Sequence, residues 1–259
     1  METVVDLTVE DEIGQITIRR PEARNALTWQ AMEQFGARVE QAAHADLRAL
    51  IVTGEGGAFC AGGDLFELHG YPSRLDGVRL SAVMSQALDR LVALPAPTIA
   101  AIEGPALGGG AEIALACDLR VMAEGAALGM MHVRLAISPA WGGAQRLVRL
   151  VGAARALEWM AAGRVLTAAD AFAAGVASRV AAKGQARDEA LNLAREIAAH
   201  DPQAVRTIKR IVQAASDLPP ADALRFERAA FPDLWAAPAH LEASAEFVAR
   251  RNHRPQPVR

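Results

Sequence analysis

The chain has 259 residues, of which 52% are hydrophobic and 22% are charged. This length and composition allow a substantial buried core without disulfides, and they exclude a disordered protein and a second full-sized domain. The formal net charge of -3 argues against a general nucleic-acid binder, whose binding face would be strongly basic.

Membrane and targeting signals are missing from the pattern. No apolar run reaches the roughly 18 residues that a membrane-spanning helix needs, and residues 1–10 lack the basic start and apolar centre of a signal peptide. We therefore expect a soluble, cytoplasmic protein. The only cysteines, Cys60 and Cys117, have no metal-binding spacing, so neither a metal site nor a disulfide framework is predicted.

The first elements in chain order predict a unit of strand, strand, helix and strand. Residues 3–10 and 13–19 alternate apolar and polar side chains, as two antiparallel strands do. Thr28 is the expected N-cap of a helix that runs to about His44. Residues 47–53 end in a β-rich apolar run that is typical of a short buried strand.

The next stretch alternates helices and strands around glycine-rich turns. A Gly-rich loop covers residues 54–64, and a helical pattern then extends over about residues 80–93. Residues 98–102 form a short strand, residues 109–116 a helix of small side chains, and residues 119–122 another strand. This alternation predicts an α/β core with sheets covered by helices.

From Gly142 onward the pattern is almost wholly helical, and residues 186–251 predict four amphipathic helices. Helices with apolar faces left over pack on their own core or on a neighbouring subunit, so an oligomer is expected. The basic end of the chain is expected to be a solvated tail; it contains Arg250, Arg251, Arg254 and Arg259.

Two glycine-rich turns carry the chemistry: Cys60-Ala61-Gly62-Gly63-Asp64 and Leu107-Gly108-Gly109-Gly110-Ala111-Glu112. Glycine permits close approach of the backbone to a ligand, and the second turn opens a helix whose positive end favours an oxyanion. Neither turn matches a P-loop or the dinucleotide-binding pattern. Together they predict an oxyanion hole.

Four motifs, in order, resemble the crotonase (enoyl-CoA hydratase/isomerase) superfamily. They are Arg20-Pro21-Glu22-Ala23-Arg24-Asn25-Ala26-Leu27, Phe59-Cys60-Ala61-Gly62-Gly63-Asp64-Leu65, Gly104-Pro105-Ala106-Leu107-Gly108-Gly109-Gly110-Ala111-Glu112 with Ala116-Cys117-Asp118, and Pro139-Ala140-Trp141-Gly142-Gly143-Ala144-Gln145-Arg146-Leu147.

The resemblance implies an α/β fold, a crotonase (ClpP-like) spiral of repeated ββα units with a helical C-terminal trimerisation region. Residues 1–185 would form the core with the acyl-CoA site, and residues 186–259 the helical oligomerisation region. The expected assembly is a homotrimer or a hexamer. The expected partner is an acyl-CoA thioester, with no nucleic acid and no membrane. No cofactor is expected, since coenzyme A is part of the substrate.

The resemblance also implies roles for single residues. The backbone N–H groups of Gly63 and Gly109 would donate to the thioester oxygen. The coenzyme A contacts of the family map onto Arg24, Ala26, Ala61 and Leu65, and Asp64 and Asp118 resemble structural carboxylates.

In the hydratases of the superfamily two glutamates hold a water between them. The first maps onto Glu112, but the second falls on His132, which cannot form a paired-carboxylate clamp. A histidine can instead donate or accept a proton. His69, in the loop after Asp64, is a weaker active-site candidate.

His132, the run from Ile137 to Gly143 and the run from Leu234 to Ala243 resemble the ethylmalonyl-CoA decarboxylase branch. Decarboxylation needs an oxyanion hole and a proton for Cα, but no water clamp. The sequence thus predicts a lyase that decarboxylates a short alkylmalonyl-CoA. A 2-enoyl-CoA hydratase or isomerase of fatty-acid or related acyl-CoA metabolism is the alternative, and a non-catalytic member that binds acyl-CoA or RNA is an alternative of another class.

Overall fold

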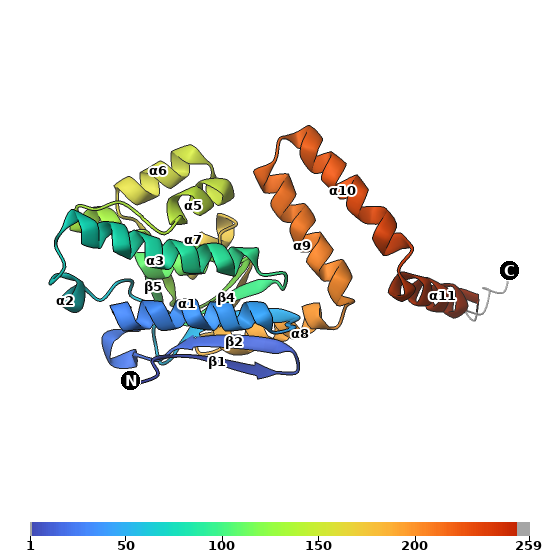
Figure 1. The fold of residues 1–259 in the computed structure, drawn as a ribbon, viewed down its shortest axis with the longest axis horizontal. Helices are drawn as coiled ribbons and strands as arrows, with labels where there is room; N and C mark the ends of the chain where they lie inside the picture. The colour runs from blue at the N-terminus through green and yellow to red at the C-terminus, as the bar shows by residue number, and fades with distance from the viewer. Residues whose placement is uncertain (1, 253–259) are drawn as a thin grey trace. The chain divides into compact units, whose positions relative to one another are not determined.

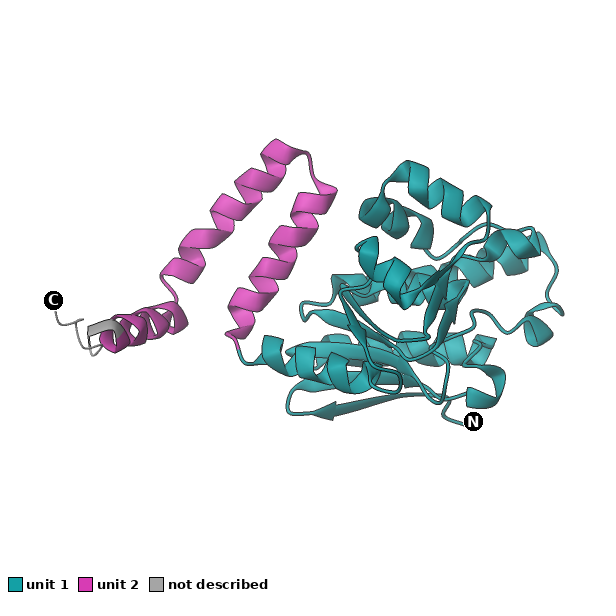
Figure 2. Ribbon diagram, turned by 180° about the vertical axis from the view of Figure 1, so that it is seen from behind, with its two compact units in different colours: residues 1–199 teal, residues 200–259 magenta. Residues whose placement is uncertain are grey.

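The computed structural model describes residues 2–252 (Figure 1), so Arg254 and Arg259 of the basic end lie outside the described residues. The chain divides after Ala199 into two compact units, residues 1–199 and residues 200–259 (Figure 2).

The strands are β1 (Val5–Glu10), β2 (Ile13–Ile18), β3 (Ala49–Gly54), β4 (Thr98–Ile102), β5 (Pro105–Leu107), β6 (Leu119–Ala123), β7 (Ala127–Gly129), β8 (Val165–Thr167) and β9 (Arg179–Ala181). The α-helices are α1 (Trp29–His44), α2 (Leu65–Leu68), α3 (Arg74–Ala93), α4 (Gly109–Ala116), α5 (Gly143–Val151), α6 (Ala153–Ala161), α7 (Ala168–Ala173), α8 (Ala186–Ala198), α9 (Pro202–Asp217), α10 (Pro220–Trp235) and α11 (Pro238–Asn252). Short 3-10 turns are η1 (Pro21–Ala23) and η2 (His132–Leu135).

The strands form two sheets. The larger sheet has the order β1-β2-β3-β4-β6-β9, and the smaller has the order β5-β7-β8. Only β1 pairs antiparallel in the larger sheet, through the hairpin with β2. All residues of β4 are buried, which is typical of a parallel strand covered on both faces. The α/β class predicted from the alternating pattern is confirmed.

The repeated unit is visible in how consecutive strands divide between the sheets. β4 joins the larger sheet, β5 joins the smaller one, and α4 follows. β6 and β7 repeat this division before η2 and α5. The structure therefore confirms a core of stacked ββα units.

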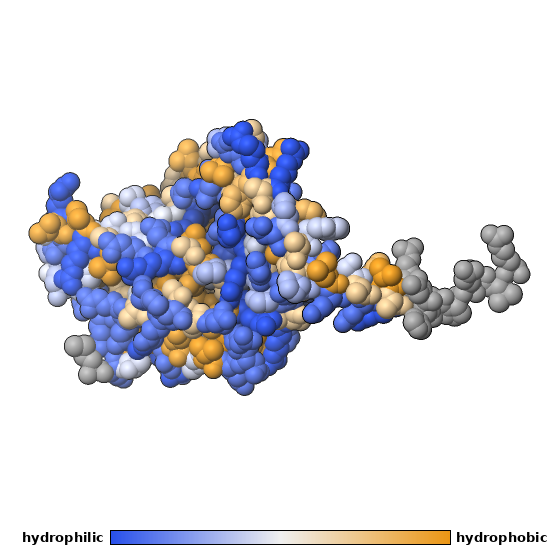
Figure 3. All heavy atoms as spheres, turned by 45° about the vertical axis from the view of Figure 1, so that its right-hand side comes forward, coloured by the Kyte–Doolittle hydropathy of each residue, from blue (hydrophilic) through white to orange (hydrophobic). Residues whose placement is uncertain are grey.

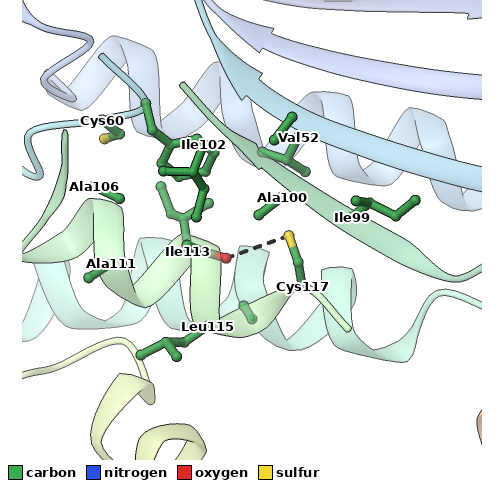
Figure 4. Close-up of a cluster of buried hydrophobic side chains, with 14 of the residues drawn as sticks. Val52, Cys60, Ile99, Ala100, Ile102, Ala106, Ala111, Ile113, Leu115 and Cys117 are labelled. Atoms are coloured by element: carbon green, nitrogen blue, oxygen red, sulfur yellow. Dashed lines mark hydrogen bonds between the residues drawn. The ribbon is translucent and has the colours of Figure 1, made fainter. Parts of the chain in front are cut away.

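Small side chains let α4 approach the sheets closely. Every residue of this helix is buried, and Ile113 lies near Ala100 and Ile102 of β4 (Figure 4). A Cβ at Gly110 would lie 2.0 Å from the backbone oxygen of Cys60, so only glycine fits there. This close contact brings the first glycine turn against the start of α4.

Caps define where the long helices begin. The Thr28 hydroxyl accepts a hydrogen bond from the N–H of Ala31, as expected for the N-cap of α1. α3 begins at Arg74, six residues earlier than the sequence pattern predicts, because Ser73 and Asp76 form a capping box. The early start places Leu80 inside the helix rather than at its end.

The expectation of an almost wholly helical region after Gly142 is wrong at two places. β8 and β9 each contribute three residues that extend the two sheets. Three residues are too few for an alternating pattern to stand out from flanking helices.

The four helices expected over residues 186–251 are present as α8 to α11, but they are not one unit. Ala186, Ala190 and Ala194 of α8 are buried, and the helix packs on β3, β4 and β6. The first compact unit runs to Ala199, and the expected division of roles at residue 185 stays a prediction.

The second unit exposes large apolar side chains, and Figure 3 shows hydrophobic residues on the surface beside hydrophilic ones. Those on α9 to α11 are Ile208, Val212, Leu224, Phe231, Trp235, Leu241, Phe247 and Val248. The homotrimer or hexamer expected from leftover apolar faces stays a prediction. Over residues 2–252, no helix combines the length and apolar character needed to cross a membrane.

Candidate active site

The two glycine turns meet beside the start of α4. Gly62 has a φ of +97°, a conformation that favours glycine, and a Cβ there would lie 3.1 Å from the backbone nitrogen of Gly109. Isolated parallel bridges join Leu27 to Gly63 and Cys60 to Ala106. The turns are therefore held against each other by backbone pairing.

The backbone pairing leaves the N–H groups of Gly63 and Gly109 available. In the bridge to Leu27, the C=O of Gly62 accepts and the N–H of Asp64 donates, so Gly63 itself uses no N–H. Gly109 is the first residue of α4, where an N–H has no acceptor within the helix. Neither N–H donates a hydrogen bond within the described part of the chain. Two convergent donors of this kind can stabilise an oxyanion.

A cavity of about 330 Å³ opens over these two donors. Most of the residues that the sequence singled out line it, namely Arg24, Ala61, Gly63, Leu65, Gly109, Glu112 and His132. Ala26 is not among the lining residues, and its role as a coenzyme A contact stays a prediction. His69 caps the end of α2 and does not line the cavity either.

Glu112 and His132 are in direct contact at the wall of the cavity. The Nε2 atom of His132 lies 3.1 Å from Oε2 of Glu112, and both side chains are buried. The other carboxylate oxygen, Oε1, accepts from the N–H of Trp141 at 2.9 Å and from the N–H of Gly143 at 3.0 Å. Both oxygens of Glu112 are therefore engaged.

Glycine at position 143 is required for this arrangement. A Cβ there would lie 2.5 Å from Cγ of Glu112 and 3.0 Å from its Oε1. Gly142 has a φ of +88°, so it turns the chain between Trp141 and Gly143 and allows the N–H groups of both to point at the carboxylate. The fourth motif contains Trp141 and Gly143, but their contacts with Glu112 could not be predicted from it, because contacts across about thirty residues leave no local signal.

His132 keeps one ring nitrogen free of protein partners. Its Nδ1 atom is buried and has no hydrogen-bond partner among the described residues. Buried polar atoms are normally hydrogen-bonded, and an unpaired one is usually explained by a functional role or by a bound water. The imidazole also lines the cavity, so it lies beside the space for a bound molecule with which it could exchange a proton.

The carboxylates that the sequence classed as structural have protein partners. Asp64 caps α2 by accepting from the N–H of Phe66, and it forms an ion pair of 2.9 Å with Arg20. Asp118 accepts from the N–H and the hydroxyl of Thr98 at 2.7 and 2.9 Å. Both aspartates therefore hold loops of the core together.

Cys60, the first residue of the first glycine turn, is buried, and Figure 4 shows it in a cluster of buried hydrophobic side chains. Burial raises the pKa of its thiol to about 12, and the backbone N–H of Gly62 offsets only part of that effect. The thiol is therefore protonated and is a poor nucleophile.

We expect native protein to resist alkylation of Cys60 by iodoacetamide at about pH 8.5, where an exposed thiol is half ionised. Mass spectrometry of the labelled peptide measures this. The same reaction in denaturant, where the thiol becomes exposed, is the control. Fast labelling of the native protein would contradict the protonated, buried thiol.

The fold matches solved structures over almost its whole length. The enoyl-CoA hydratase of Bacillus anthracis superposes with a TM-score of 0.91 at 32% identity, covering 96% of this chain and 97% of that chain. The enoyl-CoA hydratase of Polaromonas sp. JS666 superposes with a TM-score of 0.89 at 30% identity, covering 95% and 97%. This similarity places the chain in the class of proteins with the crotonase fold.

The family model for enoyl-CoA hydratase/isomerase matches residues 8–254, so the chain belongs to that family of the crotonase superfamily. A protein of Rhizobium meliloti named probable enoyl-CoA hydratase is 37% identical over 244 residues, which cover 93% of each chain. The ethylmalonyl-CoA decarboxylase of Gallus gallus is 33% identical over 235 residues, which cover 89% of this chain and 79% of that protein. The resemblance found in the sequence motifs is confirmed.

Proposed function

We propose that this protein decarboxylates a short alkylmalonyl-CoA thioester. The observation that carries the proposal is the direct hydrogen bond of 3.1 Å between His132 and Glu112. A water held between two side chains needs them further apart, because each must be within hydrogen-bond distance of the water. The arrangement therefore favours a proton donor over a water clamp.

The proposed reaction uses the two backbone donors first. The thioester oxygen lies between the N–H groups of Gly63 and Gly109, and the bond between Cα and the carboxylate breaks. The electron pair of that bond passes into the thioester to form an enolate, and CO2 leaves. The two N–H groups stabilise the negative charge that develops on the oxygen. His132 then transfers a proton to Cα, and solvent returns a proton to the imidazole.

Glu112 serves the reaction through His132 rather than by contact with the substrate. A free carboxylate beside the departing carboxylate would repel it. Here the charge of Glu112 is compensated by the N–H groups of Trp141 and Gly143 and by the imidazole of His132. The carboxylate is thereby held away from the substrate while it orients the ring.

Coenzyme A recognition is proposed at the open end of the cavity. Arg24 is exposed and lines the cavity, and a guanidinium can bind phosphate with two hydrogen bonds. Leu65 is 52% exposed and offers an apolar surface beside it. These residues, with Ala26 and Ala61, are the proposed contacts of the coenzyme A part of the substrate.

The test compares two reactions on the same protein. Ethylmalonyl-CoA and methylmalonyl-CoA are expected to release CO2 much faster than crotonyl-CoA is hydrated, with each product identified by mass spectrometry. Efficient hydration without CO2 release would assign the protein to the 2-enoyl-CoA hydratases. Binding of the thioesters without turnover of either would make it a non-catalytic member of the family.

A further inference from the structure

The indole of Trp141 lies directly against the backbone of the oxyanion donor. A Cβ added at Gly109 would lie 2.1 Å from Cζ3 and 2.5 Å from Cη2 of the indole. Trp141 is 5% exposed and lines the same cavity as Gly63 and His132. The ring therefore forms part of the cavity wall next to the place where the thioester oxygen is proposed to bind.

The backbone of Trp141 is fixed on both sides. Its N–H donates to Oε1 of Glu112 at 2.9 Å, and its C=O accepts from Nη1 of Arg146 at 2.7 Å. Arg146 is held in turn by an ion pair of 3.2 Å with Asp89. With its ring buried and its peptide groups bonded, this wall has little freedom to yield to a ligand.

The other apolar walls of the cavity differ from Trp141 in exposure. Leu65, Leu135 and Ile137 are 52%, 53% and 56% exposed. Exposed side chains change rotamer readily, so these walls can adapt to different acyl chains. The rigid part of the wall is the part beside Gly109.

We propose that Trp141 is a specificity-determining residue that limits the size of the group carried on Cα of the acyl thioester. The inference rests on the proposed function, which places the thioester oxygen at Gly109 and hence Cα one bond from the carbonyl carbon. Atoms attached to Cα meet the fixed indole, whereas atoms further along the chain meet the adaptable aliphatic side chains. Small Cα substituents fit and bulky ones are excluded.

The experiment measures binding of thioesters that can neither decarboxylate nor be hydrated. Isobutyryl-CoA, 2-ethylbutanoyl-CoA and 2-propylpentanoyl-CoA carry Cα substituents of increasing size. Calorimetric Kd values for the wild type are expected to rise along this series. Trp141→Ala is expected to lower the ratio of the last Kd to the first by about ten-fold or more, in the range that one or two methylenes contribute in an apolar pocket.

Matched variants keep the test decisive. Trp159 is also buried but does not line the cavity, so Trp159→Phe is expected to leave the Kd ratio unchanged while Trp141→Phe lowers it modestly. If Trp141→Ala does not fold, the ratios of Trp141→Leu and Trp141→Phe decide.

An unchanged Kd ratio in folded Trp141 variants, or an equal loss of affinity for all three thioesters, would overturn this inference alone. Failure of the wild type to bind any of the three would overturn the proposed function and this inference with it.

Discussion

Loss of the N–H at position 109 is expected to lower kcat by about two to three orders of magnitude, the usual cost of removing one oxyanion donor. Gly109→Pro removes that N–H, but its ring carbons would also collide with the indole of Trp141, 2.1 Å from a Cβ at this position. The collision and the lost donor must therefore be separated.

The matched pair places Gly109→Ala and Gly109→Pro in a Trp141→Ala background, which makes room for a Cβ. Both double variants carry the added carbon, and only the alanine one keeps the donor. The kcat with ethylmalonyl-CoA is expected to be about 100-fold or more lower for the proline variant. Proline is tolerated at the first position of a helix, so α4 is expected to survive in both. Equal kcat values for the pair would remove Gly109 from the proposed oxyanion hole.

His132→Ala is expected to slow formation of the protonated product by about 100-fold or more, since it removes the proposed proton donor. In deuterated water the enolate would then be protonated by solvent, so deuterium at Cα is expected to lose its stereochemical preference. Product analysis by NMR measures both the rate and the stereochemistry.

Because His132 and Glu112 are in direct contact, the loss of rate caused by changing one of them is expected to depend on the presence of the other. Glu112→Gln keeps an acceptor for the N–H groups of Trp141 and Gly143 but places an amide NH2 against Nε2 of His132. This change removes the negative charge that stabilises the protonated imidazole, the form that donates a proton, and is expected to reduce the rate strongly. In His132→Ala the same change is expected to cost little more, because the group it positions is gone. Additive losses would mean that Glu112 acts on the substrate independently of His132.

Most of the fold could be predicted from the sequence, because the patterns that indicate its helices and strands are local. The alternating hairpin, the Thr28 cap and the four C-terminal helices are each read within a few residues, and the structure contains them. The early start of α3 was also readable, since Ser73 and Asp76 have the spacing of a capping box. β8 and β9 were not, because three-residue strands depend on pairing with distant partners.

The residues that line the candidate site could be predicted from the sequence, but the contacts between them could not. The family resemblance singles out Gly63, Gly109, Glu112 and His132, and all four line the same cavity. Nothing local indicates that His132 touches Glu112, or that Trp141 covers Gly109. Such contacts join residues 20 or more positions apart and depend on packing, which residue pattern alone does not define.

The backbone pairing around the proposed oxyanion donors has a consequence for stability. The N–H of Ala61 donates to Arg24, that of Leu27 to Gly62, and that of Leu107 to Cys60, at 2.8 to 3.0 Å. Segments held in this way open together with the core instead of fraying as separate loops. Heat or denaturant is therefore expected to displace the two proposed donors only when the core itself unfolds, so activity should be lost together with the folded structure.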